Sequence, residues 1–416
     1  MGSALSKESK FSKKSVLVFG IITNVALLGY FKYSDFFITN FNLSTGLHVE
    51  LLHLLLPLGI SFFTFTQIAF LVDIYKGGGK FKEVDFLNYT LFVTFFPHLL
   101  AGPIIHHADM MPQFASRWNM AVRYRNVAAG LFLFSIGLFK KVVIADTFAT
   151  WANNGFDVAT TLNLLEAWAT SLSYTFQLYF DFSGYTDMAI GVSLMLNIKL
   201  PANFNSPYKA KDIQDFWRRW HITLSKFLRD YIYIPLGGNQ VSFYRNYFNL
   251  FSVFLIGGLW HGASWMFVLW GALHGVAMVI HRIWKDMGFK MNSFLAWFIT
   301  FNFINITWVF FRAKEWDDAL KVLGGMVGGH GISLCDCLNF NLFHNIGITF
   351  GHVFVNSNLN QNTLTFMFFT LIILTQKNST QYNNTIKKPS WLLTALLLTA
   401  SFLFINNNTE FLYFNF

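Results

Sequence analysis

Charged residues are scarce in this sequence of 416 residues. Asp, Glu, Lys and Arg together make up 12% of the chain, whereas hydrophobic residues make up 54% and aromatic residues 19%. A soluble domain carries about 25% charged residues, so half of the polar coat that a soluble protein needs is missing. A lipid-facing surface needs no such coat, and bulky aromatic rings suit lipid-facing and interfacial positions. We therefore predict an integral membrane protein.

Several motifs of catalysis and cofactor binding are also missing. The two cysteines, Cys335 and Cys337, supply neither a disulfide framework nor four zinc ligands, and we interpret them as ordinary loop residues. None of the 12 histidines lies in a metal-binding pattern, and the sequence has no Gly-x-Ser-x-Gly, P-loop or dinucleotide fingerprint. These absences argue against a metal centre and against a triad serine.

Nucleic-acid binding is the usual interpretation of a basic protein, and this chain has a formal net charge of +9. However, its Lys and Arg residues lie in short clusters between apolar runs. The tendency of basic loops to stay on the cytoplasmic side of a membrane produces this pattern. We therefore predict no nucleic-acid partner. The stretch 147–165 has no Lys or Arg, and we expect it on the opposite side.

Apolar stretches that can cross or enter a bilayer recur along the whole chain, and no separate soluble domain is visible. A helix needs about 17 to 25 residues to cross. The stretches lie near residues 16–31, 50–72, 86–105, 126–145, 166–196, 247–261, 264–284, 293–312, 361–376 and 391–406. We predict one all-α transmembrane domain, 1–416, with about ten transmembrane or re-entrant helices.

Stretch 86–105 is predicted to be re-entrant. Pro97, Gly102 and Pro103 interrupt it, and basic clusters flank it on both sides. A proline breaks a plain helical span, and non-helical backbone at membrane depth must be buried in protein. We therefore expect this segment to enter and leave the membrane on the same side.

The stretch from Pro201 to Asp230 is too charged to cross a membrane. Its six basic residues and three aspartates alternate with Phe, Trp and Leu, a pattern typical of an interfacial or half-inserted helix. Asp215 can pair with Arg218 and Arg219 at helical spacing. These arginines are candidates to meet the phosphates of a nucleotide-bearing donor.

His261 is the first candidate catalytic residue, because it lies in the apolar run Phe254-Leu-Ile-Gly-Gly-Leu-Trp-His-Gly-Ala-Ser-Trp265. An ionisable group at membrane depth is costly and usually has a function. The surrounding glycines allow a substrate or a backbone to approach the ring, and histidine suits proton transfer at neutral pH. The structural alternative is a neutral histidine that a neighbouring helix satisfies.

His221 is the second candidate, in Asp215-Phe-Trp-Arg-Arg-Trp-His221. In a continuous helix it shares a face with Trp217. One interpretation places it on the surface of an interfacial helix. The other makes it a second polar group that converges on the site of His261. His274 follows His261 by thirteen residues, on nearly the opposite face of a continuous helix, and we interpret it as structural.

A third polar cluster, Gln177-Leu-Tyr-Phe-Asp-Phe-Ser-Gly-Tyr-Thr-Asp187, lies inside the apolar stretch 166–196. Carboxylates within a span require partners, and basic or hydroxyl groups on other helices are the expected ones. Asp181 and Asp187 therefore predict links between helices. Lining a substrate tunnel is the competing hypothesis.

At these motifs the sequence resembles the membrane-bound O-acyltransferase family, in its bacterial branch of alginate O-acetylase membrane subunits and peptidoglycan O-acetyltransferases. The resemblance covers about residues 55–315. The matching segments are Pro57-Leu-Gly-Ile-Ser-Phe-Phe-Thr-Phe, Ala101-Gly-Pro-Ile, Gly137-Leu-Phe-Lys-Lys-Val-Val-Ile-Ala-Asp146, Gln177 to Asp187, Asp215 to His221, Gly258-Leu-Trp-His-Gly-Ala-Ser-Trp265 and Trp308-Val-Phe-Phe-Arg-Ala313.

The resemblance implies a bundle around a central funnel, with His261 as the active histidine and His221 at the second polar position. It implies acetyl-CoA as a cytoplasmic donor, a cell-envelope polysaccharide as acceptor, a periplasmic acetyltransferase as partner and a multi-pass location in a bacterial inner membrane. The residues that we expect to contact substrate or donor are Arg218, Arg219, Asp215, Trp217, Trp260, Gln177, Asp181, Ser183 and Tyr185.

Two other hypotheses stay open at this point. The same fold can transfer D-alanyl or another acyl group, and a carrier of glycan or lipid without chemistry of its own would also bury Asp181, Asp187 and His261. The matched segments favour the acetylase branch. Members of that branch have further apolar spans before the stretch corresponding to 16–31, so we expect the N-terminal part of the bundle to be shorter here.

Overall fold

The computed structural model describes residues 5, 12–77, 86–99, 102–334, 349–350, 391–405 and 411–412. Their regular structure is helical apart from two strands of two residues, β1 (Ser333–Leu334) and β2 (Thr349–Phe350), which pair in parallel. The predicted all-α fold is confirmed for these residues. Cys335, Cys337 and the stretch 361–376 lie outside them.

Four helical segments are long and apolar enough to cross a membrane. They are Lys13–Thr45, Tyr124–Val158, Trp265–Asp286 and Ser293–Arg312. A helix of 20 residues is about 30 Å long, which matches the hydrocarbon core of a bilayer. The membrane prediction is thus supported, whereas the count of about ten is not confirmed in the part of the chain that the structure describes.

The first span is longer than the predicted stretch 16–31. It consists of α2 (Lys13–Leu28), the π-helical turn η1 (Gly29–Tyr33) and α3 (Ser34–Thr45). Such turns occur often at functional positions, and η1 carries Lys32.

The stretch 50–72 is helical only in its second part, and our prediction of one helix was wrong there. Helix α4 (Ile60–Gly77) begins after Gly59, whose φ of +72° favours glycine. Before it, the Asp35 carboxylate accepts hydrogen bonds from the backbone N–H groups of Leu52 (2.7 Å) and His53 (3.0 Å). A distant carboxylate thus satisfies backbone groups that a helix would have satisfied internally.

The predicted interruption of 86–105 is confirmed. Helix α5 (Phe86–Thr94) ends before the 3₁₀ turn η2 (Phe96–His98), which contains Pro97. Helix α6 (His107–Phe114) follows, and then the 3₁₀ turn η3 (Arg117–Met120). Entry and exit on one side of the membrane stays a prediction.

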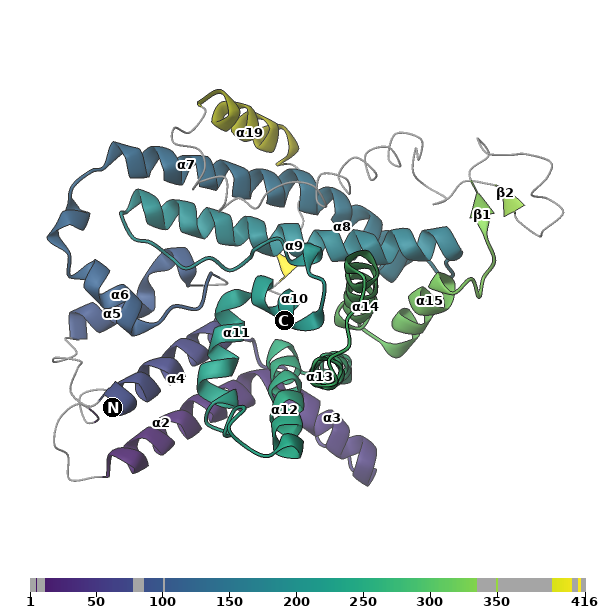
Figure 1. The fold of residues 1–416 in the computed structure, drawn as a ribbon, viewed down its shortest axis with the longest axis horizontal. Coiled ribbons are helices and arrows are strands. Elements are labelled where there is room, and N and C mark those ends of the chain that lie inside the picture. The colour runs from purple at the N-terminus through teal and green to yellow at the C-terminus, as the bar shows by residue number, and fades with distance from the viewer. Residues whose placement is uncertain are drawn as a thin grey trace.

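Two long helical segments lie side by side and form one layer of the molecule (Figure 1). The first comprises α7 (Tyr124–Phe139), the π-helical turn η4 (Lys140–Ala145), α8 (Asp146–Asn153) and the π-helical turn η5 (Asn154–Val158), and the second is α9 (Leu164–Met195). A Cβ placed on Gly137 would lie 2.5 Å from the Gly184 carbonyl oxygen, and one on Gly130 would lie 2.5 Å from that of Gly191. These glycines let the two backbones touch.

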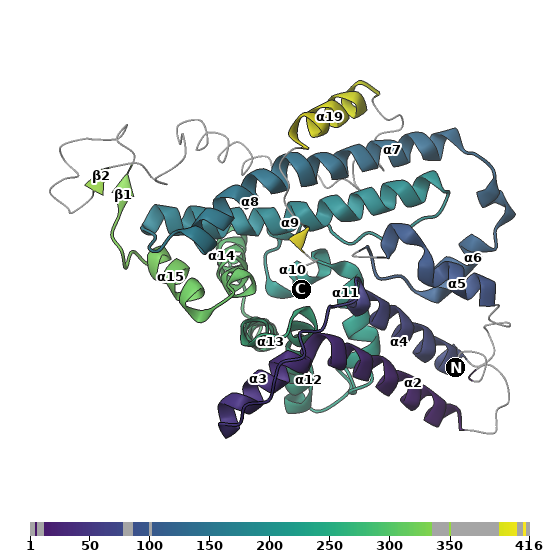
Figure 2. The same cartoon turned by 180° about the vertical axis from the view of Figure 1, so that it is seen from behind.

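The segment 201–230 is not one interfacial helix, which corrects our prediction. It contains the 3₁₀ turn η6 (Pro207–Lys209), α10 (Ile213–Arg219) and α11 (Ile222–Leu228), and the π-helical turn η7 (Arg229–Tyr233) follows. The chain breaks at His221, whose φ is +42°. Figures 1 and 2 show α10 and α11 between the α7–α9 layer and helices α2 and α4.

Four of the remaining helices match predicted stretches closely. They are α12 (Phe243–His261), α13 (Trp265–Asp286), α14 (Ser293–Arg312) and α19 (Trp391–Phe404). Helix α15 (Trp316–Met326) was not predicted. Helices α12 and α13 pack along each other as a hairpin. Buried aromatic residues from α9, α10, α12, α13 and α14 form one continuous core.

Candidate active site

His261 is the last residue of α12 and is 4% exposed. Gly262 has extended backbone and α13 begins at Trp265, so the chain reverses direction directly after the histidine. Three aromatic rings enclose the imidazole, with centroid distances of 4.9 Å to Trp260, 5.1 Å to Trp270 and 5.0 Å to Phe311. The predicted burial of this ionisable group is confirmed.

The glycines around His261 serve close packing. A Cβ on Gly258 would lie 2.4 Å from the Phe267 carbonyl oxygen and 2.9 Å from the Gly271 Cα, so α13 occupies that space. A Cβ on Gly262 would lie 2.2 Å from the Phe267 ring. The sequence allowed either a substrate or neighbouring protein to approach at these glycines. At Gly258 and Gly262 the structure shows neighbouring protein.

Lys32 anchors the carbonyl end of α12. Its ammonium donates hydrogen bonds to the carbonyl oxygens of Trp260 (2.8 Å) and His261 (2.9 Å) and to the hydroxyl oxygen of Ser61 (3.3 Å). The hydroxyl of Tyr33 donates to the carbonyl oxygen of Leu259. The last carbonyls of a helix lack partners within it, and a cation there also interacts favourably with the helix dipole.

We did not predict this role of Lys32 from the sequence. The signal was present, because a lysine directly after the apolar run 16–31 is an ionisable group at the edge of a span. Its partner lies more than two hundred residues further along the chain, and local sequence patterns do not reveal such a contact.

His221 is fully buried between α10 and α11, so the surface alternative was wrong. Its Nδ1 lies 3.2 Å from the side-chain oxygen of Asn203, which also accepts hydrogen bonds from the backbone N–H (3.1 Å) and hydroxyl (2.9 Å) of Thr223. An amide oxygen only accepts, so Nδ1 carries the proton and Nε2 carries the lone pair. Burial lowers the pKa of His221 to about 3, and the ring is therefore neutral at physiological pH.

The backbone at His221 is unusual for a residue with a side chain. A φ of +42° lies in the left-handed region, where few residues other than glycine occur. Such conformations persist where the surroundings impose them, and they cluster at functional sites. The resulting break also separates His221 from the face of Trp217, so the predicted shared helical face was wrong.

His221 and His261 lie in the same aromatic core. Both pack against the Trp260 ring, whose centroid lies 6.4 Å from the His221 ring and 4.9 Å from the His261 ring. The structure thus brings together the two histidines that the sequence singled out.

His274 also belongs to this core, which the sequence analysis did not predict. Trp217 Nε1 donates to His274 Nδ1 (3.2 Å), so the imidazole proton resides on Nε2, which lies 3.2 Å from the Thr307 hydroxyl oxygen. That hydroxyl donates to the Ile304 carbonyl oxygen (2.9 Å). A continuous helix through 261 and 274 was expected, whereas the chain reverses direction between them. Both ring nitrogens are hydrogen-bonded, which supports the structural interpretation.

The candidates on α10 separate into an inner and an outer group. Trp217 is buried against His274, whereas Asp215 pairs with Arg219 (2.8 Å) and is half-buried. Arg218 is exposed. The predicted pairing at helical spacing is confirmed for Arg219, and contact of these arginines with a donor stays a prediction.

The carboxylates of α9 pair with lysines of η4. Asp187 lies 2.6 Å from the ammonium of Lys140, and Asp181 lies 2.7 Å from that of Lys141. Lys141 also contacts Asp146 at 2.9 Å. The predicted links between helices are confirmed, and contact of Asp181 with substrate stays a prediction.

Three further candidates on α9 are Gln177, Ser183 and Tyr185. Gln177 and Ser183 are buried, and Tyr185 stacks on Phe411 with centroids 4.7 Å apart. The neighbouring Phe182 faces His221 instead, at 4.8 Å between centroids. Roles of Gln177, Ser183 and Tyr185 in substrate binding remain predictions.

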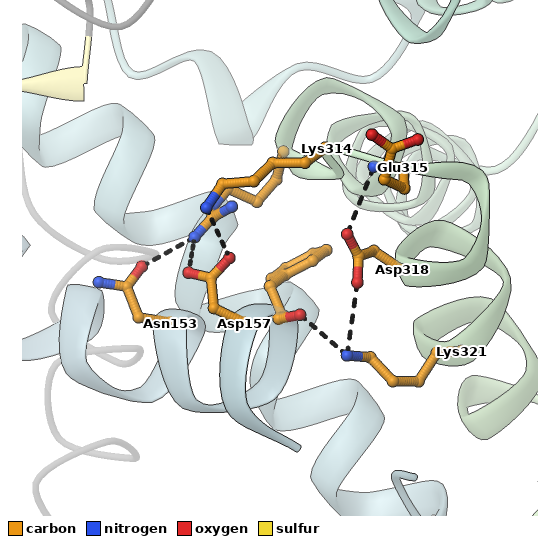
Figure 3. A network of polar contacts seen from close by, with 8 residues as sticks. Asn153, Asp157, Lys314, Glu315, Asp318 and Lys321 are labelled. Atoms are coloured by element: carbon orange, nitrogen blue, oxygen red, sulfur yellow. Dashed lines mark hydrogen bonds and ion pairs between the residues drawn. The ribbon is translucent and has the colours of Figure 1, made fainter. Parts of the chain in front are cut away.

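A separate polar network joins the end of α14 to η5 (Figure 3). Arg312 contacts Asp157 at 2.5 Å and Asn153 at 3.0 Å, and Lys314 contacts Asp157 at 3.3 Å. Lys321 donates to the carbonyl oxygens of Phe156 and Ala159. These contacts fix the stretch 147–165 to α14 and α15.

The set of groups around His261 suits proton transfer. Neutral imidazoles can accept and return a proton at neutral pH. In the described residues, no group of three or more His, Cys, Asp or Glu side chains is placed to hold a metal ion. The ammonium of Lys32 and the aromatic rings hold the histidines in position.

Comparison with known proteins gives a consistent result. The sequence model of the membrane-bound O-acyltransferase family matches residues 79–313. The chain is 53% identical to a peptidoglycan O-acetyltransferase of Helicobacter pylori over 445 aligned residues, covering 97% of this chain and 83% of that protein. It is 42% identical to a probable alginate O-acetylase of Pseudomonas aeruginosa, covering 74% of this chain and 60% of that protein.

A more distant relative differs in its acyl group. The teichoic acid D-alanyltransferase of Bacillus subtilis is 28% identical over 272 residues, which cover 62% of this chain and 69% of that protein. The chain thus spans about three fifths of the length of the alginate relative and about four fifths of the peptidoglycan relative.

Proposed function

Because the chain belongs to the membrane-bound O-acyltransferase family, we propose that it moves an acetyl group from acetyl-CoA toward hydroxyl groups of a cell-envelope polysaccharide. Family membership makes the protein an O-acyltransferase. Acetyl is the proposed acyl group because the peptidoglycan and alginate relatives, named as an O-acetyltransferase and a probable O-acetylase, match it at 53% and 42% identity, compared with 28% for the D-alanyltransferase.

His261 acts in this proposal as the general base. Its ring takes the proton of an acceptor hydroxyl while the hydroxyl oxygen forms a bond to the carbonyl carbon of the thioester. The carbon–sulfur bond then breaks, and the imidazolium returns the proton to the leaving thiolate. A covalent variant, in which His261 first carries the acetyl group, gives the same products. The observation that carries the proposal is the burial of His261 beside a second neutral histidine.

His221 has a positioning role in this proposal. Asn203 fixes the proton on Nδ1, so Nε2 can accept a hydrogen bond from an acceptor hydroxyl. The left-handed backbone at this residue holds the ring against Trp260 and Phe182. His221 and His261 would thus bind one alcohol from two sides.

In this proposal, substrates reach the His261 imidazole through a narrow passage. Its side chain lies among three aromatic rings, so substrates must reach it through a passage that these rings line. We propose the central funnel implied by the family for this purpose. A cysteine-directed reagent small enough to enter should label His261→Cys in membranes, and acetyl-CoA should protect it. If that cysteine stayed inert to reagents from both sides, the enzymatic proposal would fail.

The proposal also covers the final acceptor, the membrane location and the partner protein. We propose a multi-pass location in a bacterial inner membrane, with the donor on the cytoplasmic side. The peptidoglycan and alginate relatives favour a polysaccharide outside the membrane as acceptor, reached with the help of a periplasmic acetyltransferase.

Purified protein with acetyl-CoA labelled in the acetyl group tests the proposal directly. We expect acetyl transfer to a soluble oligosaccharide, or slow hydrolysis without one, and loss of both in His261→Ala. D-Alanyl transfer from a carrier protein in place of acetyl transfer would support the alternative acyl group. Movement of glycan across vesicles with the thioester intact would instead indicate a carrier.

A further inference from the structure

A cavity of about 780 Å³ opens between α13 and α14, at the end where the loop 287–292 joins them. Its volume lies within the usual range of ligand sites, about 300–1,000 Å³. Apolar residues of the two helices form one wall, and polar residues of the loop and of the start of α10 form the rim. The cavity therefore has two chemically different ends.

The apolar wall faces outward. Val276 and Ile280 on α13 are 47% and 58% exposed, and Ile299 on α14 is 48% exposed. Both helices are long and apolar enough to cross a membrane. Apolar side chains exposed on such spans meet the lipid acyl region, so this wall is open to lipid along its length.

The rim carries an excess of positive charge. Lys211, Lys285 and Lys290 are exposed at the rim, and Lys211 donates a hydrogen bond to the Ser293 hydroxyl (3.2 Å). The acidic rim residue Asp212 lies 3.7 Å from His281. The rim thus carries three ammonium groups and one carboxylate, which already has a basic neighbour.

Trp284 identifies the depth of this rim. It lines the cavity next to the lysines and is 38% exposed. Tryptophan gathers where the hydrocarbon of a bilayer meets the headgroups. The lysines therefore lie at the level of lipid phosphates, with the apolar wall extending beneath them.

We propose that this groove binds one anionic phospholipid, with an acyl chain along Val276, Ile280 and Ile299 and the phosphate at Lys211, Lys285 and Lys290. Basic pockets between transmembrane helices are suited to anionic headgroups, and each lysine near such a surface adds attraction. This inference goes beyond acyl transfer and does not depend on the roles of the histidines.

The test uses the full chain, purified in a zwitterionic detergent and titrated with phosphatidylglycerol or phosphatidylcholine, with native mass spectrometry as the measure of bound lipid. We expect wild type to prefer phosphatidylglycerol. The triple variant Lys211→Gln/Lys285→Gln/Lys290→Gln should lose about fivefold in affinity for each lysine removed, with phosphatidylcholine binding unchanged. A matched control, Lys13→Gln/Lys14→Gln/Lys199→Gln, removes the same charge from exposed positions outside the groove.

A second variant tests the acyl wall. Val276→Trp places a bulky ring on the exposed acyl wall while all lysines remain, and it should abolish phosphatidylglycerol binding without lowering the unfolding temperature in detergent alone. Equal losses in the two triple variants would show a general charge effect and overturn the proposal. Displacement of phosphatidylglycerol by millimolar coenzyme A or inorganic phosphate would also overturn it, because the groove would then bind a soluble phosphate ligand.

Discussion

The α7–α9 layer and the α12–α13 hairpin both bury polar side chains, but they stabilise them in different ways. In the first, carboxylates of α9 meet ammonium groups of η4 at 2.6–2.7 Å. In the second, His261 at the end of α12 lies among tryptophan and phenylalanine rings, and His221 from the break between α10 and α11 packs against the same Trp260 ring. Opposite charges fix helices, whereas neutral imidazoles keep the capacity to exchange a proton. The two regions therefore differ as a structural region differs from the proposed catalytic one.

Replacing His261 with alanine should have the largest effect, a loss of acetyl transfer. Positioned base catalysis contributes about 10²–10⁴-fold, so we expect acetyl transfer to fall by at least that factor. Thermal unfolding should change far less than activity, and a urea or thermal melt monitored by tryptophan fluorescence provides the control. Near-normal turnover by the alanine variant would remove the imidazole from the mechanism.

Replacing Lys140 with methionine should destabilise the α7–α9 layer, the structural side of the comparison. It leaves Asp187 buried without its ammonium partner, and loss of one member of a buried pair costs about 3–5 kcal/mol of unfolding free energy. The double variant Lys140→Met/Asp187→Leu removes both charges and should recover most of that stability. If the single variant melted like wild type, the ion pair would not hold α9 to η4.

Lys32 sharpens the comparison, because here a charge contacts the backbone of the proposed catalytic histidine. Hydrogen bonds to a charged group contribute about 1.5–3 kcal/mol, so Lys32→Met should lower kcat by about tenfold to a hundredfold through displacement of His261. Lys32→Arg keeps the charge and should restore part of the rate. A loss of stability with unchanged kcat in the folded fraction would assign Lys32 to folding alone.

Substitution of Asn203 should give the smallest of these effects on activity. A neutral hydrogen bond contributes about 0.5–1.5 kcal/mol, so Asn203→Ala should lower kcat/KM for the acceptor by about twofold to tenfold. Because burial lowers the pKa of His221 to about 3, the ring stays neutral from pH 5 to 8 and the pH profile should keep its shape. A profile that shifted with this substitution would show that His221 titrates in the working range.

The sequence predicted regular, strongly apolar helices well. The predicted stretch 293–312 coincides with α14, because a single apolar run with polar ends determines its limits. The burial of His261 and the pairing of Asp181 with a lysine on another helix also followed from the cost of polar groups at membrane depth.

The features that sequence patterns missed depend on contacts distant in the chain. The break at His221 is stabilised by Asn203, and the non-helical stretch before α4 is stabilised by Asp35. Helical spacing alone favoured continuous helices at both places. The proximity of His274 to His261 likewise requires the chain reversal after Gly262. The spacing of residues in the local sequence does not predict this reversal.

The hydrogen bonds from Lys32 to the last carbonyl groups of α12 have a practical consequence for shortened versions of the chain. The family match begins at residue 79, so a version trimmed to that region would keep every histidine of the core but lose Lys32 and Tyr33. Three carbonyl groups at the tip of α12 would then point into a poorly hydrated interior with no donor supplied by the first span. The fragment would also lose Phe62 and Phe65 of α4, which pack on Trp260. We therefore expect slow turnover that a peptide of residues 12–77 restores.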